Sequence, residues 1–542
     1  MLQGSGRLLS CNIFMSDKIM TKYLVNRILR GICSIIIVIG IVMMMIYGIM
    51  DRNLIFAKDS QYTKTNNNQK ITYKYQTWEN YGYLDYVTFS EYLQMLLAEG
   101  EIDEETMSKA VTLSRKAEND SDLTKEYVQK FNEYYKSQGY TVKRLDAVMA
   151  SPRKVASGGN QTLFAYRDVP LFTRLGAYLR NLVQVDSIHN VENIVGERGI
   201  TFTLHDPAYG GEKFSPAIMG NGTTNRYLLY FDDQFPYFHQ NIIKISLGTS
   251  YSVNLGVDVF DTMNQSQGSF KKSTITYPTG LVAESADNLH TATYVEGSRD
   301  SLLVLQDRYV DDYTNVSTSK SGFSKVGYSF VIGIMSILLA YFLGVPLGIV
   351  MARNKDKLVD KILTCYIVFI IAVPSLAYIF LFKAIGGELG LPTTFDMDAA
   401  TKLVFVLPVV SLALRSIADL MKWMRRYMID QMNSDYVKFA RSGGLSENEI
   451  FTKHVLKNAI IPIVHGIPGS LLVALTGAII TERVYVVPGA GNLLTKAINT
   501  YDNGVIIGVT LFYAVISVLS VILGDILISM VDPRISFSSK DR

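Results

Sequence analysis

The sequence predicts an α-helical polytopic membrane protein with a large mixed α/β extracellular domain between its first and second spans. Six long apolar stretches, a polar region between the first two of them, and the overall composition support this fold class. Of the 542 residues, 48% are hydrophobic and 19% are charged, and the mean hydropathy is +0.17. These values suit neither a soluble enzyme nor a wholly embedded bundle. The net charge of +3 is too small to indicate a nucleic-acid partner.

Six stretches are long and apolar enough to cross a membrane, which takes about 20 residues in a helix. In chain order, the predicted transmembrane helices are 32–50, 326–352, 362–382, 403–424, 459–481 and 505–530. The first stretch is not expected to be a removed signal peptide, because it starts far from the N-terminus and lacks a small-residue cleavage site. An even number of spans places both termini on one side.

The distribution of lysine and arginine sets the orientation, because these residues concentrate in cytoplasmic loops. They precede the first span, separate the second from the third, and fill the loop between the fourth and fifth. We therefore expect a multi-pass protein of the bacterial plasma membrane with both termini in the cytoplasm. The expected divisions are a cytoplasmic tail at 1–31, a first helix at 32–50, an extracellular domain at 51–325, a five-helix core at 326–530 with a cytoplasmic loop at 433–458, and a cytoplasmic tail at 531–542.

The predicted extracellular domain has two parts. Residues 88–148 show helical spacing of apolar positions, whereas the chain from about residue 196 reads as short strands and turns. Segments 64–70 and 317–324 are predicted linkers. The many tyrosines predict a surface suited to protein contacts. The 3 cysteines lie outside this domain, so no disulfide framework is expected, which fits a bacterial protein.

The loop between the fourth and fifth predicted spans is polar and basic, yet its pattern is that of two ordered short helices. Residues 433–435 (NSD) can cap the first helix, and Gly443 and Gly444 allow the reversal that ends it. Residues 446–449 (SENE) form a capping box that opens the second helix. Pro462 suits the first turn of the span that follows.

This loop resembles the coupling loop of ABC importer permeases of the oligopeptide/dipeptide family. Six residues match that motif in position: Ala440, Gly444, Leu445, His454, Asn458 and Pro462. The resemblance extends over the first span and from about residue 227 to 535. It includes the turn at 482–491 (ERVYVVPGAG) and a weaker element at 245–250 (ISLGTS), where Ser246 replaces the family's aspartate. The long insert is similar to that of Gram-positive oligopeptide permeases of the Ami/Opp type.

The resemblance implies the type I ABC importer permease fold and ATP-driven import of oligopeptides by alternating access. Implied partners are a second permease subunit in a heterodimer, two cytoplasmic ATPase subunits, an extracellular peptide-binding lipoprotein, the peptide itself and membrane lipids. ATP and Mg would be bound by the ATPase subunits. The residues expected to couple this chain to the ATPases are Asp435, Tyr436, Ala440, Gly443, Gly444, Leu445, Glu449, His454 and Asn458.

A second set of residues is a candidate pathway or gate: Arg415, Asp419, Glu482, Pro488 and Gly489. Arg415 and Asp419 are four residues apart, so they share a helix face and can pair. A charge at membrane depth should face protein or water. A structural pair inside the bundle is the preferred interpretation, with a polar pathway lining as the alternative. Glu482 is either a gate element or an interface charge. The GxxxG spacings at 344–348 and 504–508 allow packing within the chain or between subunits.

The sequence lacks a G-x-x-x-x-G-K-[ST] phosphate loop, a His-Glu-x-x-His motif, a Cys-x-x-Cys motif and a nucleophile elbow. We therefore expect a transport subunit rather than an enzyme, with no catalytic residue, cofactor or metal site of its own. Two alternatives remain open. The cargo could be a dipeptide or a nickel complex, or the chain could be a membrane-anchored extracellular sensor or adhesin.

Overall fold

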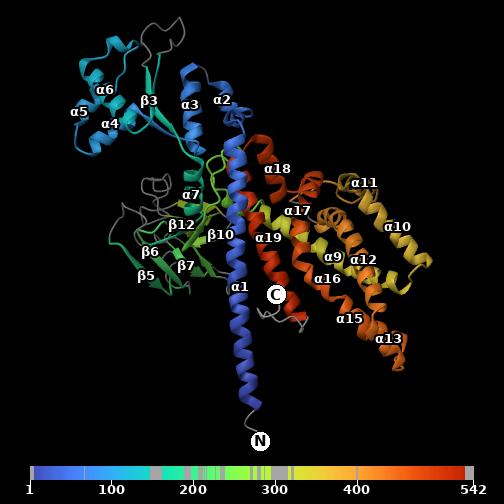
Figure 1. The fold of residues 1–542 in the computed structure, drawn as a ribbon. Coiled ribbons are helices and arrows are strands. Elements are labelled where there is room, and N and C mark those ends of the chain that lie inside the picture. Colours follow the sequence, from blue (N-terminus) through green and yellow to red (C-terminus); the bar gives the residue numbers. More distant parts are fainter. Residues whose placement is uncertain are drawn as a thin grey trace.

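The computed structural model describes residues 5–531 except 66, 147–160, 188–196, 206–211, 213, 215, 226, 232–237, 269–272, 277–281, 286, 294–314, 319–322 and 398–400. A long helix α1 (Ser5–Met44), extended by a π-helical turn at Met45–Ile49, stands between two parts of the molecule. Figure 1 shows a helical bundle on one side of α1 and a group of short strands on the other.

Five helices in the described part of the chain are long and apolar enough to cross a membrane. They are the 25–49 part of α1, α9 (Lys325–Arg353), α12 (Val406–Met432) with its preceding turn Lys402–Phe405, α17 (Ile467–Tyr485) and α19 (Asn503–Val531). The predicted fifth span begins instead as two short helices, α15 (Leu456–Ala459) and α16 (Ile461–His465).

The predicted third span is not one straight helix. It consists of α10 (Leu358–Ala372) and α11 (Ser375–Glu388), which meet at an angle of 113°. Pro374 explains the break, because proline has no N–H to donate and disfavours a helical conformation in the residue before it. Val373 is extended accordingly, with ψ 132°. The described chain therefore has six spans only if this bent pair is counted as one.

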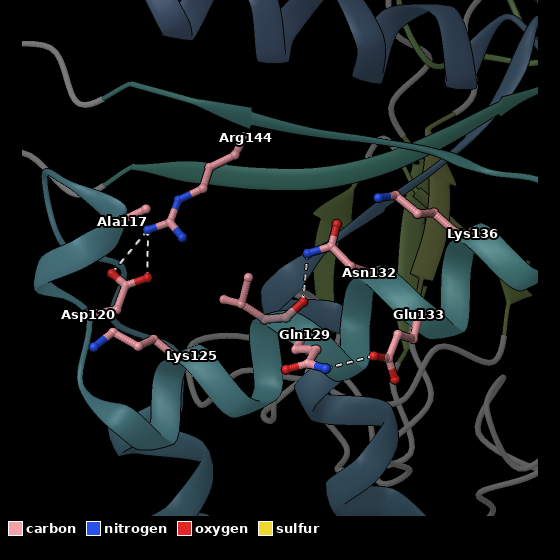
Figure 2. Close-up of a pocket in the computed structure, with 9 residues that line it drawn as sticks. Ala117, Asp120, Lys125, Gln129, Asn132, Glu133, Lys136 and Arg144 are labelled. Atoms are coloured by element: carbon pink, nitrogen blue, oxygen red, sulfur yellow. Dashed lines mark hydrogen bonds and ion pairs between the residues drawn. The ribbon is translucent and has the colours of Figure 1, made fainter.

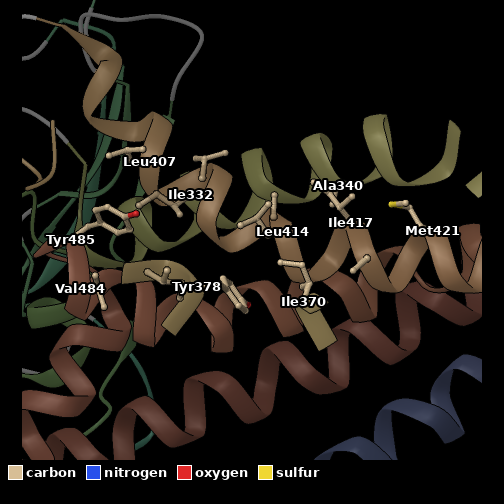
Figure 3. Close-up of a cluster of buried hydrophobic side chains, with 14 of the residues drawn as sticks. Ile332, Ala340, Ile370, Tyr378, Leu407, Leu414, Ile417, Met421, Val484 and Tyr485 are labelled. Carbon is tan, nitrogen blue, oxygen red and sulfur yellow. The ribbon is translucent and has the colours of Figure 1, made fainter. Parts of the chain in front are cut away.

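The bundle core lies where α9, α10, α11 and α12 meet the end of α17. Ile332, Tyr378, Leu414 and Tyr485 are among the buried side chains that fill it (Figure 3). α9 and α12 approach closely because α9 has glycine at 344 and 348. A Cβ on Gly348 would lie 2.7 Å from the Cβ of Met424. The glycines at 344 and 348 therefore allow two helices of the same chain to pack closely.

The chain between α1 and α9, called the insert here, begins with a helical lobe. The lobe comprises α2 (Ser60–Lys64), α3 (Asn67–Asn80), β1 (Leu84–Thr88), α4 (Phe89–Ala98), α5 (Glu104–Ala110), α6 (Asp122–Ser137), β2 (Thr141–Leu145) and β3 (Thr162–Asp168). Its three strands form an antiparallel sheet in the order β1-β3-β2. The helical pattern predicted for 88–148 is confirmed by α4, α5 and α6, but its last part is wrong, because 141–145 form β2. The predicted linker at 64–70 is also wrong, because α2 and α3 occupy most of it.

The second part of the insert is mainly antiparallel strands. α7 (Leu171–Asn181) leads into β4 (Val183–Val185), which pairs with β9 (Ile243–Ile245). A four-stranded sheet has the order β5 (Gly199–Thr203), β6 (Ala217–Asn221), β7 (Tyr227–Phe231) and β8 (Phe238–Gln240). The helix α8 (Val259–Asn264) and the pairs β10 (Ser273–Thr276) with β11 (Val282–Ser285) and β12 (Asp287–Thr293) with β13 (Asn315–Thr318) follow. Residues 301–310, within the part of the chain read as strands, and residues 319–322 of the predicted linker 317–324 lie outside the described residues, whereas 317 and 318 belong to β13.

Most tyrosines in the described part of the insert are buried, which contradicts the predicted tyrosine-rich surface there. Tyr75, Tyr83 and Tyr86 belong to one buried aromatic cluster, and Tyr92 and Tyr135 belong to another. Their rings bury large apolar areas against one another. Aromatic composition therefore reports core packing here.

Candidate functional site

The 433–458 loop folds as its pattern predicted, with one exception at its start. α13 (Asp435–Ser442) ends at Gly443, and Gly444 has φ +84°, a left-handed conformation that favours glycine. α14 (Glu447–Glu449) opens with a complete capping box between Ser446 and Glu449 and continues as a π-helical segment, Ile450–Val455. The exception is the start of α13, where the Ser434 hydroxyl donates to the Gln431 carbonyl and no side chain caps the helix.

One face of this loop is packed against the bundle. Val437, Ala440, Ile450 and Val455 are buried with residues from the ends of α9 and α12. At the end of α9, Arg353 donates to the Asn448 side chain at 3.1 Å. The loop is therefore held as a rigid extension of α9 and α12, which suits it to transmit displacement.

The other face of the loop is exposed and charged. Arg441 and Glu447 pair across the glycine turn, with 2.5 Å between Nε and Oε1, and this interaction lowers the pKa of Glu447. Hydrogen bonds from the Ser446 hydroxyl and backbone lower the pKa of Glu449. Phe439 stands among these charges with 81% of its surface exposed. We did not predict Phe439 from sequence, although a phenylalanine flanked by basic residues on a short polar helix is a usable signal.

The remaining predicted coupling residues are distributed between the two faces. Asp435 is exposed and pairs with Lys438, and Leu445 is exposed at the turn. Tyr436 is half-buried and donates its hydroxyl hydrogen bond to the Gln431 side chain at 2.8 Å. His454 and Asn458 are half-buried on the second helical segment.

Arg415 and Asp419 form the predicted pair on α12, but they are not inside the bundle. Nε of Arg415 lies 3.2 Å from Oδ2 of Asp419, and their side chains are 46% and 40% exposed. The preferred interpretation, a buried structural pair, is therefore wrong for this chain. Arg415 also donates to the carbonyl of Ile371, close to the break between α10 and α11.

Glu482 lies in the last turn of α17, and Pro488 and Gly489 lie in the short connection between α17 and α18. Glu482 has no exposed surface, which does not fit an interface charge. Its carboxylate accepts hydrogen bonds from the Ser329 hydroxyl at 2.5 Å and the Asn492 N–H at 3.0 Å, so it caps α18 (Ala490–Thr500). A negative charge is favourable at this position because the N-terminus of a helix carries partial positive charge. A Cβ on Gly489 would lie 2.2 Å from the carboxyl carbon of Glu482.

Comparison with known proteins identifies a matching family and several relatives. The model of the binding-protein-dependent transport system inner membrane component matches residues 344–537. The chain is 33% identical over 528 residues to the oligopeptide transport system permease protein AmiC of Streptococcus pneumoniae, covering 96% of this chain and 99% of AmiC. It is 32% identical over 229 residues to the dipeptide transport system permease protein DppB of Lactococcus lactis, covering 41% and 73% of the two chains. The chain belongs to the family of inner membrane components, or permeases, of binding-protein-dependent transport systems.

A solved structure with some likeness to the permease is that of the MetNI methionine ABC transporter in inward-facing conformations. The likeness covers 38% of the permease and 93% of that chain, at 12% sequence identity and a TM-score of 0.32.

Three carboxylates outside the predicted site form hydrogen bonds between separate segments of the permease, and sequence reasoning missed them. Asp360 at the start of α10 accepts two hydrogen bonds from Arg425 of α12, both at 2.7 Å. Asp258 accepts a hydrogen bond from the Ser246 hydroxyl. Ser246 stands where the family has an aspartate, so a carboxylate twelve residues further along the chain is present beside this element. Asp502 is the third. These partners are distant in sequence, and no local pattern links them.

Asp502 joins the insert to the helical bundle. Its Oδ2 accepts from the Ser250 hydroxyl at 2.8 Å and from the backbone N–H groups of residues 251–253 at 3.0 to 3.2 Å. The next residue, Asn503, donates to the Tyr83 hydroxyl at 2.9 Å. Gly504 completes the contact, because a Cβ there would lie 2.1 Å from the carbonyl oxygen of Thr249. The glycines at 504 and 508 therefore leave room for the backbone of the insert of the same chain.

A cavity of about 460 Å³ lies in the helical lobe of the insert, between α6 and β2 (Figure 2). Buried Asp120 pairs with Arg144 at 2.8 Å on one side of it. Lys125, Glu133 and Lys136 line the remainder. Side chains of both charge signs thus line the cavity, together with the apolar Ala117 and Val128.

Proposed function

We propose that this permease is a membrane subunit of an ATP-driven importer that carries oligopeptides into the cell by alternating access. The main support for the proposal is the extent of the match to AmiC. It covers 96% of this chain and therefore includes the insert as well as the transmembrane helices. The dipeptide permease DppB matches over 41% of the chain. Oligopeptides are therefore favoured over dipeptides or a nickel complex as cargo.

The exposed face of the 433–458 loop is the proposed contact with two cytoplasmic ATPase subunits, which would bind ATP and Mg. Phe439 offers an apolar side chain to a partner pocket, and Arg441 with Glu447 fixes the turn beside it. Val437 and Ala440 on the opposite face are packed against α9 and α12. Closure of the ATPases would therefore move the ends of those two helices.

A second permease subunit is proposed to cover the charged face of α12. Arg415 and Asp419 lie near the middle of a span with about half of their surfaces exposed. Charged groups at that depth are costly against lipid, so they should face a partner or a water-filled pathway. A heterodimer that encloses the pathway at this face satisfies both requirements.

The insert is proposed to lie outside the cell, following the distribution of basic residues, and to help dock a peptide-binding lipoprotein. Support for docking comes from its position, because Asp502 ties residues 250–253 to the start of α19.

The test is reconstitution of the permease with co-expressed ATPases, the second permease and the lipoprotein in proteoliposomes. ATP-dependent accumulation of a labelled oligopeptide is expected, and excess unlabelled oligopeptide should compete better than a dipeptide or a nickel complex. An intact complex that hydrolyses ATP but accumulates no oligopeptide would contradict the proposed cargo. A permease that purifies without any ATPase under mild conditions would favour the sensor or adhesin alternative.

A further inference from the structure

A cavity of about 300 Å³ opens on the charged face of α12, between α9, α12 and the α16–α17 region. Its wall has six side chains that bear polar or aromatic groups: Tyr341, Ser416, Asp419, Trp423, Tyr427 and Ser470. This volume is at the lower end for small-molecule sites. The cavity therefore has room for one end of an oligopeptide rather than for a whole one.

Asp419 places a carboxylate in this wall within the fourth predicted span, 403–424. It lies thirteen residues from each end of α12. A charged group there is typical of a substrate or ion pathway.

The carboxylate can accept donors beyond its present partner. Arg415 contacts Oδ2 at 3.2 Å, whereas a carboxylate has about four lone-pair sites on its two oxygens. Arg415 itself does not line the cavity and also donates to the Ile371 carbonyl. The charge presented to the cavity is therefore negative.

The aromatic side chains of the wall supply an apolar surface. Trp423 and Tyr427 are stacked, with ring centroids 5.7 Å apart. Lys422 and Arg426 each lie 5.3 Å from the Trp423 centroid, so the chain's own cations already make the cation contacts of this ring. Neither of these basic side chains lines the cavity, and Arg426 pairs with Asp430 at 3.8 Å.

Across the cavity, two hydroxyl groups can bind peptide backbone. The Tyr341 hydroxyl and Ser470 Oγ lie 3.1 Å apart, and either can donate to the other. Ser470 also donates to the Gly466 carbonyl at 2.9 Å, and Tyr341 lies 3.4 Å from the Ile463 carbonyl, so both hydroxyl protons have acceptors within the chain. A hydroxyl oxygen accepts two hydrogen bonds, so the pair can still accept from a peptide N–H group. The wall thus combines an anionic group, an aromatic face and backbone-binding hydroxyls.

We propose that this cavity binds the protonated amino terminus of the transported peptide. Asp419 pairs with the terminal ammonium, Trp423 and Tyr427 contact the first side chain, and Tyr341 with Ser470 binds the adjoining backbone. The inference rests on the proposed function and specifies which end of the cargo this subunit recognises. Asp419 is thereby a substrate-binding residue.

The experiment uses the full reconstituted transporter and two peptides of one sequence, one with a free amino terminus and one N-acetylated. Both are measured at concentrations that saturate the lipoprotein, and the ratio of their initial uptake rates is compared between permease variants. The lipoprotein is the same throughout, so its own preference cancels in that comparison. The wild type is expected to favour the free peptide. Asp419→Asn should reduce this preference by roughly tenfold or more, the loss expected for a charge-assisted hydrogen bond.

Two control variants separate recognition from folding. Asp430→Asn removes a carboxylate of the same helix that does not line the cavity, and it should keep the wild-type ratio. The double variant Arg415→Gln/Asp419→Asn leaves no unpaired arginine, so it should fold while still lacking the preference.

The outcomes distinguish the two proposals. If the wild type imports neither peptide while its ATPases hydrolyse ATP, the proposed function fails. If the wild type imports the free peptide and both Asp419 variants keep the wild-type ratio, the amino-terminal site is wrong and the proposed function stands. A wild-type ratio of one that no variant changes would also overturn the site.

Discussion

Gly489 shows how one absent side chain permits a buried charge. The carboxylate of Glu482 occupies the space where a Cβ at Gly489 would lie, and from there it accepts hydrogen bonds from Ser329 and from the first turn of α18. Burying a carboxylate is tolerated when such hydrogen bonds replace water. The glycine and the glutamate therefore act as one structural unit.

We predict that Gly489→Ala destabilises the permease, because the methyl group would displace the Glu482 carboxylate from its donors. The expected loss is about 1–3 kcal/mol, as for other overpacked interiors. Thermal unfolding in detergent measures it. Gly469→Ala is the matched control, since a Cβ there meets nothing within 4 Å. Equal stability of the two variants would show that the turn rearranges freely.

At the scale of elements, the 433–458 loop depends on one left-handed residue between two short helices. Gly444 has φ +84°, whereas the adjacent Gly443 has φ −75°, which any residue adopts. The left-handed conformation costs other residues roughly 1–2 kcal/mol. The relative direction of α13 and α14 is set at this position.

We predict that Gly444→Ala lowers peptide uptake more than Gly443→Ala does, with the two proteins at equal levels in the membrane. The strain would re-aim α14 and weaken the contact with the ATPases. Gly444→Pro should have a larger effect, because proline cannot adopt a positive φ. Uptake and ATPase co-purification are the two measurements. Wild-type values of both for Gly444→Pro would contradict the coupling role.

One ion pair adds to the apolar packing of α10 on α12. Asp360 is 4% exposed and receives both hydrogen bonds from Arg425, whereas the neighbouring Arg426 pairs with Asp430 at the surface. We predict that Arg425→Leu destabilises the permease by about 3–5 kcal/mol, because it leaves a buried carboxylate unpaired. Arg426→Leu should change stability little.

Thermal unfolding of the two leucine variants checks this prediction, and a third variant isolates its cause. Asp360→Asn combined with Arg425→Leu removes the uncompensated charge and should recover part of the lost stability. If Arg425→Leu and Arg426→Leu unfold at the same temperature, the α10–α12 pair contributes nothing specific.

At the scale of the whole molecule, the insert is joined to the bundle by apolar packing, in which Leu247, Val259 and Met263 are buried with residues of α18 and α19, and by polar contacts. Asp502 gathers the backbone of residues 251–253, and Asn503 binds Tyr83. Burial raises the pKa of Tyr83 to about 12, so its hydroxyl stays neutral at physiological pH. The insert can therefore follow the movement of α19 during transport.

We predict that Asp502→Ala loosens this connection without unfolding the insert. Hydrogen exchange of the amides at 251–253 should accelerate, because these groups lose their acceptor, while the amides of β1 and β3 stay protected. Asp168→Ala is the control, since that carboxylate is exposed and pairs with Arg52 within the insert. Unchanged exchange at 251–253 would show that other contacts hold the insert.

The sequence by itself determined the spans, the order of helices before strands in the insert, and the 433–458 loop. These features are local: an apolar run, a helical period and a capping box each lie within about 20 residues. Pro374 marked an interruption of the third span in the sequence, whereas the 113° bend between α10 and α11 came from the structure. Composition misled on the tyrosines, because residue type does not distinguish an aromatic core from an aromatic surface.

Only the tertiary structure decided which charges are buried, paired or presented to a cavity. Glu482 accepts a hydrogen bond from Ser329, 153 residues away in the sequence, and Asp502 accepts one from Ser250, 252 residues away. Arg415 and Asp419 pair as their spacing predicted, yet their exposure depends on how α12 is rotated against α9. The free energy of a charge is set by the groups and solvent around it, and folding brings those groups from distant parts of the chain.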